Sequence, residues 1–159
     1  MPEALGLSID PMRREDVDHV LDIERAVFPV PWSRRAFLNE VEDAATSIAR
    51  VARRSGRVIG YAIAWKVVEE LHIGNLAVAP RERRRGVARS VLDHVLNAAA
   101  DLGLQYATLE VRVSNLAAIA LYEACGFRPI ALRRGFYPDN GEDAMVMLRD
   151  VASERVKGR

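Results

Sequence analysis

The stretch RRRGVAR, residues 83–89, gathers positive charge around a single glycine directly before a helical pattern. A helix start presents about four unpaired backbone N–H groups and roughly half a positive charge, so it attracts phosphate. Gly86 and the small Ala88 leave the main chain open to close approach by a linked phosphate group, and the arginines can add charge-assisted hydrogen bonds. The stretch predicts a local anion site, with a solvated basic loop at the helix start as the alternative.

Two common kinds of nucleotide site do not fit this stretch. The sequence has no GxGxxG fingerprint, and Gly86 is not followed by the lysine and Ser/Thr pair that a phosphate loop requires. We therefore expect neither a dinucleotide nor a triphosphate here.

A carboxylate interrupts the apolar segment YATLEVRV, residues 106–113. Alternation along a strand places Thr108, Glu110 and Arg112 on one face and the apolar residues between them on the other. Glu110 is therefore expected to face a cleft or water. The alternative is an exposed strand carboxylate that pairs with Arg112.

Asn115 and Tyr122 lie two helical turns apart in the segment SNLAAIALYE, so they share one helix face. One ligand can touch both side chains. The alternatives are that Asn115 is an N-cap and that Tyr122 is an aromatic core residue with its hydroxyl at the rim.

His72 and Cys125 are harder to assign. A lone strand histidine such as His72 is usually structural. Cys125 is the only cysteine, which excludes an intramolecular disulfide and a multi-thiol metal site. Because nothing nearby would activate a thiolate, we expect a small buried hydrophobe rather than a nucleophile. No metal site is expected.

Hydrophobic periodicity predicts the elements that must position these residues. Strands are expected at residues 7–12, 70–78, 106–113, 127–134 and 143–150, with two more in 47–68 that meet at a Ser55-Gly56 turn. Helices are expected from Asp16 to Phe28, from a Ser33 cap to about Glu42, from Val87 to Leu102, and over residues 115–125. Because hairpins alternate with crossovers, we predict an α+β fold of the three-layer α/β type, with a mixed sheet of about seven strands and about four helices on both faces.

Composition narrows the class of protein without indicating a function. Half of the residues are hydrophobic, 28% are charged and the formal net charge is +1. These values are ordinary for a globular protein and give no general reason to expect nucleic acid or an anionic membrane as partner. No apolar stretch reaches the roughly 18 to 20 residues of a membrane span, and the N-terminus lacks a signal pattern, so a cytoplasmic protein is expected. The length predicts one domain over residues 1–151 and a frayed tail at 152–159.

The segment NLAVAPRERRRGVARSVL resembles the acetyl-CoA-binding motif of the GNAT superfamily of N-acetyltransferases, whose signature is Gln/Arg-x-x-Gly-x-Gly/Ala. Arg83 opens the signature, Gly86 is its glycine and Ala88 is the permitted last member. The segments FPVPWS, LEVRVSNLAAIALYEACGF and RRGFYPDNGEDAMVM are similar to the RimI-like branch, which acetylates protein N-terminal α-amines. The three consecutive arginines differ from the glutamine-containing version of close relatives, so the backbone contacts of this loop carry over more securely than its side-chain contacts.

The resemblance implies acetyl-CoA as cosubstrate, no metal, and the GNAT fold. In that family the pantetheine arm pairs with the backbone of the strand before the loop, and the pyrophosphate rests on the loop amides. The matching residues are Leu76, Ala77 and Val78 for the pantetheine arm, and Arg84, Arg85, Gly86, Val87, Ala88 and Arg89 for the pyrophosphate. Asn115 matches an asparagine that bonds the pantetheine.

The resemblance also implies the catalytic groups. Glu110 matches the general base of the RimI-like branch, which acts through water, and Tyr122 matches the tyrosine that protonates the thiolate. His72 is a secondary candidate, because N-terminal acetyltransferases often carry a histidine there that helps hold the catalytic water. Phe28, Pro31, Trp32 and Tyr137 correspond to loops that wall the peptide site, with plain edge packing as the alternative.

The implied function is Nα-acetylation by direct transfer to the N-terminal alanine of a small-subunit ribosomal protein. One alternative keeps the fold and transfers acetyl to a lysine or a small-molecule amine. Another is a non-catalytic acetyl-CoA-binding or interaction module docked on ribosomal RNA. We expect a monomer or weak homodimer, with no direct nucleic-acid contact and no membrane association.

Overall fold

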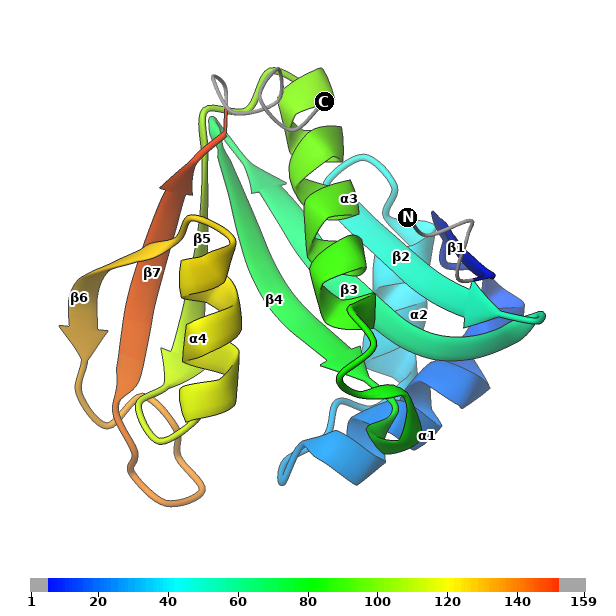
Figure 1. The fold of residues 1–159 in the computed structure, drawn as a ribbon, viewed down its shortest axis with the longest axis horizontal. Coiled ribbons are helices and arrows are strands. Elements are labelled where there is room, and N and C mark those ends of the chain that lie inside the picture. The colour runs from blue at the N-terminus through cyan, green and yellow to red at the C-terminus, as the bar shows by residue number, and fades with distance from the viewer. Residues whose placement is uncertain (1–5, 152–159) are drawn as a thin grey trace.

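The computed structural model describes residues 6–151, which form a seven-stranded sheet with α-helices on both faces (Figure 1). The strands are β1 (Leu7–Pro11), β2 (Ser47–Arg54), β3 (Arg57–Val67), β4 (Glu70–Val78), β5 (Tyr106–Arg112), β6 (Arg128–Arg133) and β7 (Ala144–Asp150). The α-helices are α1 (Val17–Val27), α2 (Arg34–Glu42), α3 (Val87–Asp101) and α4 (Leu116–Ala124). The predicted sheet and helices are confirmed, whereas the tail at 152–159 that was expected to fray lies outside the described residues.

The sheet is mixed, as predicted, with the strand order β1-β2-β3-β4-β5-β7-β6. β4 and β5 pair in parallel, and the other neighbouring strands pair antiparallel. A parallel pair needs a long crossover, and α3 supplies it. β7 enters between β5 and β6, so the C-terminal hairpin extends the sheet on the far side of β5.

Strand alternation divides the core into two layers. On β2, Ala49 and Val51 pack with residues of α1 and α2, while Ile48 and Ala52 pack with residues of α3. Figure 1 accordingly shows α3 on one side of the sheet and α2 on the other. Within residues 6–151, no helix is both long and apolar enough to cross a membrane.

Local signals set the helix ends where the sequence indicates them. The Ser33 hydroxyl accepts a hydrogen bond from the Ala36 amide at 3.1 Å and caps α2. Gly103 and Gly126 follow α3 and α4 with φ of +79° and +93°. This left-handed backbone closes a helix and costs glycine little.

The parallel pair of β4 and β5 opens into a fork. Its register joins residues 70–73 to residues 106–109 and goes no further. Beyond them, β4 stays paired with β3, and β5 stays paired with β7. Among the described residues, the facing edges of 74–78 and 110–112 therefore have no strand partner, and we call these two arms the β4–β5 fork. Figure 1 shows the arms diverging, with α3 beside one and α4 beside the other. Unpaired backbone groups of this kind can bind an extended ligand.

Gly74 lies where β4 crosses the indole ring of Trp65 on β3. A Cβ at this position would overlap the six-membered ring of Trp65. The ring is held from other sides, because its Nε1 donates to Oε1 of Glu40 at 2.7 Å and it stacks on Trp32 with centroids 5.9 Å apart. Trp65 cannot move aside without weakening those contacts.

We expect Gly74→Ala to destabilise the fold by about 1–3 kcal/mol, because the added methyl group displaces Trp65. Urea unfolding of the wild-type and variant proteins measures the difference in the free energy of unfolding. In a Trp65→Phe background the smaller ring leaves room, so the cost of Gly74→Ala should shrink. An equal cost in both backgrounds would show that the overlap is not the cause.

Candidate active site

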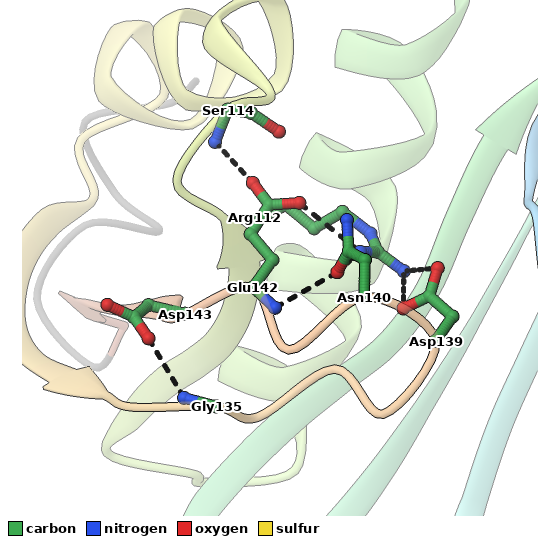
Figure 2. Close-up of polar contacts among 7 residues, drawn as sticks. All are labelled: Arg112, Ser114, Gly135, Asp139, Asn140, Glu142 and Asp143. Carbon is green, nitrogen blue, oxygen red and sulfur yellow. Dashed lines mark hydrogen bonds and ion pairs between the residues drawn. The ribbon is translucent and has the colours of Figure 1, made fainter.

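Glu110 lies on β5 where the β4–β5 fork opens, and two partners hold its carboxylate. Oε1 is 2.7 Å from Nε2 of His72 on β4, and Oε2 is 3.5 Å from Nη1 of Arg133 at the end of β6. The Glu110 side chain is 16% exposed, so the carboxylate can still be reached. Arg112, the alternative partner on the same strand, bonds instead to the segment between β6 and β7 (Figure 2).

Glu110 and His72 shift each other's pKa values in opposite directions. The hydrogen bond from His72, with the charges of His72 and Arg133, holds the pKa of Glu110 below its usual value, although burial opposes this shift. The hydrogen bond to Glu110 raises the pKa of His72, again against burial. Glu110 is therefore ionised near neutral pH, and His72 is the member of the pair that titrates closer to neutrality. Together they can orient a water molecule and take up one proton.

Two tyrosines belong to the same neighbourhood. Tyr122 on α4 packs edge-on against Phe127, with ring centroids 5.9 Å apart. Burial raises the pKa of Tyr122 to about 12, and the nearby Tyr137 adds to the shift. Burial also raises the pKa of Tyr137; the charge of Arg112 opposes this and that of Glu110 reinforces it. Tyr122 thus keeps its proton at neutral pH and can donate it to a group that develops negative charge.

The N-terminus of α3 presents open backbone amides. Gly86 is the N-cap, with a left-handed φ of +76°, and no side chain among the described residues caps the helix. Arg84 also has a left-handed φ, +65°, which is uncommon for a residue with a side chain. Left-handed residues beside right-handed ones can turn successive N–H groups toward one point, a geometry that binds anions. Arg85 lies nearby, with Nη1 3.6 Å from Oε1 of Glu82.

The residues predicted to hold pantetheine lie on the β4 arm of the fork and at the start of α4. Leu76, Ala77 and Val78 lie on the β4 arm, where Ala77 and Val78 are buried, so this stretch offers a ligand its backbone. Asn115, at the start of α4, accepts a hydrogen bond from the Ala118 amide at 3.2 Å through its side-chain oxygen. The alternative N-cap role is thus observed, and the contact of Asn115 with pantetheine stays a prediction.

The segment between α1 and α2 reaches His72 through an aromatic stack. Trp32 stacks on Trp65, and the rings of Trp65 and His72 lie 5.7 Å apart by their centroids. Phe28 packs partly against the core beneath α1, and Pro31 is exposed. The sequence analysis did not identify Trp65 as a residue of the site. Alternation along β3 was the available signal, because it places this large aromatic side chain on the face that α1 covers.

Glu24 is a second residue that sequence reasoning missed. It is 1% exposed and accepts hydrogen bonds from the Trp32 amide at 2.9 Å, from Nδ2 of Asn75 at 3.0 Å and from the Tyr61 hydroxyl. These donors satisfy a buried carboxylate without a cation among the described residues. Glu24 thereby ties the segment before α2 to β3 and β4. The sequence did contain an indication of its burial, because Glu24 lies within the apolar stripe of the first helix.

Cys125 is buried, and burial raises the pKa of its thiol. A protonated, enclosed thiol is a poor nucleophile, which agrees with the expectation of direct transfer. Within the part of the chain that the structure describes, no group of three or more His, Cys, Asp or Glu side chains is placed to hold a metal ion.

Comparison with known proteins gives a consistent result. A family model described as the acetyltransferase (GNAT) family matches residues 17–127. The ribosomal protein bS18-alanine N-acetyltransferase of Escherichia coli is 33% identical over 147 residues, covering 91% of this chain and 98% of that protein. The crystal structure of the ribosomal-protein-alanine N-acetyltransferase from Escherichia coli matches with a TM-score of 0.84 at 31% identity, over 92% of this chain and 94% of the other. An N-acetyltransferase from Thermoplasma acidophilum, solved with coenzyme A, shares the fold at 14% identity, with a TM-score of 0.78 over 91% and 98% of the two chains.

The pair of Glu110 and His72 makes stability depend on pH. The raised pKa of His72 contributes stability that is complete below its ordinary value of 6.5 and is lost as the pH rises through the folded-state pKa. The lowered pKa of Glu110 contributes stability that is complete above its ordinary value of 4.5 and is lost as the pH falls through the folded-state pKa. The pair therefore stabilises the fold most between these two values.

We expect His72→Asn to lower the free energy of unfolding more at about pH 5.5 than at about pH 9. Urea unfolding of both proteins at the two pH values measures the loss. His19→Asn, which removes an imidazole from an exposed position of α1, is the matched control. An equal loss at both pH values for His72→Asn would contradict the charged pair.

Proposed function

Since the chain belongs to the acetyltransferase (GNAT) family, we propose that it transfers acetyl from acetyl-CoA to the α-amine of an N-terminal alanine, and that its acceptor is ribosomal protein bS18. The observation that carries the proposal is the hydrogen-bonded pair of Glu110 and His72 at the opening of the β4–β5 fork, close to the partly buried phenols of Tyr122 and Tyr137. The relative from Escherichia coli, a ribosomal protein bS18-alanine N-acetyltransferase that is 33% identical over 91% of this chain, supports the choice of acceptor.

The cosubstrate supplies an acetyl thioester, and this chain's residues fit its three parts. The amides at the start of α3, around Gly86, suit the pyrophosphate. The unpaired edge of residues 76–78 suits the amide groups of pantetheine, and Asn115 can contribute from the start of α4. The thioester would then lie between the Glu110 pair and Tyr122.

Transfer forms a C–N bond and breaks a C–S bond, so one proton must leave the amine and another must reach the departing thiolate. Glu110 takes the amine proton through a water molecule that His72 helps to hold, and the hydroxyl of Tyr122 gives its proton to the departing sulfur. The pKa of Tyr122, about 12, keeps that proton in place until the thiolate forms. Acid and base help of this kind accelerates a reaction by about 10²–10⁴-fold.

An N-terminal α-amine suits this base better than a lysine. Its ordinary pKa is about 7.7–8.0 against about 10.4 for lysine, so its neutral form costs some 3 kcal/mol less to present at pH 7. A carboxylate with a lowered pKa, such as Glu110, is a modest base. The proposal therefore places α-amines ahead of lysine side chains.

We expect Glu110→Gln and Tyr122→Phe each to lower kcat for an alanine-initiated peptide by about 10²–10⁴-fold, because each substitution removes one proton-transfer group. Coenzyme A binding by the Glu110→Gln variant, measured by calorimetry, should stay unchanged. A peptide with a blocked N-terminus and an internal lysine is the competing acceptor. Faster turnover of that peptide would overturn the proposed acceptor class, and a fully active double variant would overturn the catalytic assignment.

The acceptor itself is tested by mass spectrometry of ribosomal proteins from cells with and without the gene. Loss of one acetyl group from the N-terminus of bS18 is the expected result. An unchanged bS18 together with a loss on another protein would reassign the acceptor and leave the reaction intact.

We expect Gly86→Asp to raise the KM for acetyl-CoA by about tenfold, because a carboxylate at the N-cap competes with phosphate for the same amides. The fold should survive, since a Cβ at Gly86 meets no atom within 4 Å and aspartate tolerates left-handed backbone. Gly86→Asn is the matched neutral control and should raise this KM less. An unchanged KM for acetyl-CoA in both variants would show that the pyrophosphate does not bind at this site.

A further inference from the structure

The segment that joins β6 to β7, residues 134–143, has no apolar anchor. None of its residues is buried, and Tyr137 is only half-buried. A segment without buried side chains is placed by its polar contacts. The groups that make those contacts therefore decide where Tyr137 stands.

Arg112 lies at the end of β5, outside this segment, and its guanidinium bonds to several residues of the segment (Figure 2). Its Nη2 donates to both carboxylate oxygens of Asp139 at 3.1 Å. Its Nη1 donates to Oδ1 of Asn140 and to Oε1 of Glu142 at 3.3 Å each. The guanidinium carbon also lies 4.0 Å from the centre of the Tyr137 ring. Only a planar, forked cation can bind a carboxylate at two points and stack on a ring at the same time.

Hydrogen bonds within the segment 134–143 connect Glu142 to Tyr137, so the contacts that fix Glu142 also fix Tyr137. Oε2 of Glu142 accepts a hydrogen bond from the Ser114 amide at 2.9 Å, and its backbone oxygen accepts one from the Tyr137 amide at 3.1 Å. Oδ1 of Asp143 accepts the Gly135 amide at 2.8 Å (Figure 2). Hydrogen bonds from Ser114 lower the pKa of Glu142 to about 2, so this acceptor stays ionised at any working pH.

The hold also sets the position of Tyr137 relative to the base. Arg112 is two residues from Glu110 on β5, and both lie in the stretch of β5 that is paired with β7. Tyr137 is close enough to Glu110 and to Tyr122 for their charges to influence one another. One rigid strand therefore carries both the base and the group that holds Tyr137 beside it.

We infer that Arg112 is a positioning residue for the acceptor site: it fixes the segment 134–143 so that Tyr137 walls the acceptor peptide beside Glu110. The inference rests on the proposed function, because it assigns Tyr137 to the acceptor side of that reaction. In the structure of residues 6–151, the Arg112 side chain bonds to Asp139, Asn140 and Glu142 and stacks on Tyr137, all within the segment 134–143. Its loss should therefore weaken the binding of the peptide more than that of acetyl-CoA.

Steady-state kinetics with the alanine-initiated peptide test the inference. Arg112→Gln should raise the peptide KM by about tenfold, with kcat and the KM for acetyl-CoA within about threefold of wild type. Arg112→Lys keeps the positive charge but lacks the planar guanidinium. Its peptide KM should therefore fall between those of the wild-type and Arg112→Gln proteins. Arg128→Gln, which removes an exposed arginine from β6, is the matched control and should change neither KM.

A double-mutant cycle separates positioning from a general structural role. If Arg112 acts through Tyr137, the variant with both Arg112→Gln and Tyr137→Ala should have the peptide KM of Tyr137→Ala alone. Independent, multiplying effects would overturn the inference, as would an equal rise in the KM for acetyl-CoA. If Arg112→Gln does not fold, Glu142→Gln, which weakens the same hold, takes its place in the cycle.

Hydrogen exchange reads the position of the segment without any acceptor. The amides of Gly135 and Tyr137 should exchange faster in Arg112→Gln than in the wild-type and Arg128→Gln proteins. Unchanged exchange would also overturn the inference. Because this readout needs no turnover, a wrong acceptor in the proposed function remains distinguishable from a wrong role for Arg112.

Discussion

The point at which β4 and β5 stop pairing is the constraint on which the rest of the site depends. Parallel pairing ends at Ile73 and Leu109, and the next residue of β5 is Glu110. Strands that stayed paired would satisfy each other's backbone groups and leave no edge for an extended ligand. Because they diverge, β4 offers its backbone, α3 offers its first amides, and the hydrogen-bonded pair of Glu110 and His72 stands at the opening of the fork.

Charged groups around the fork are held by protein partners before any substrate binds. Glu110 is held by His72 and Arg133, and the buried Glu24 is satisfied by amide and hydroxyl donors. On the other side, the guanidinium of Arg112 is held by carboxylates of the segment between β6 and β7. Groups fixed in this way need little rearrangement when charge develops during the reaction, which is the usual source of electrostatic catalysis. The cost of burying each charge is offset by its partners.

The parts of this architecture that depend on neighbours in sequence were predictable. Hydrophobic periodicity, the Ser33 cap and the glycines that end helices act within a few residues. The mixed sheet was predicted from the order of the helices and strands that these signals indicate. The side of β5 on which Glu110 projects also follows from alternation alone. The partners of these groups depend on register between distant strands: His72 meets Glu110 across a parallel pair, and Trp65 meets His72 across an antiparallel one. Arg112 was expected as the alternative partner of Glu110, but the acidic residues of a later segment bind it instead.

The most direct test of this account is the distance between the coenzyme sulfur and the Tyr122 hydroxyl in a crystal structure of the complex with coenzyme A. We expect the two atoms to lie within hydrogen-bond distance of each other, with the pantetheine amides bonded to the unpaired edge of β4. A sulfur placed outside the fork, or a Tyr122 hydroxyl turned away from it, would contradict the account.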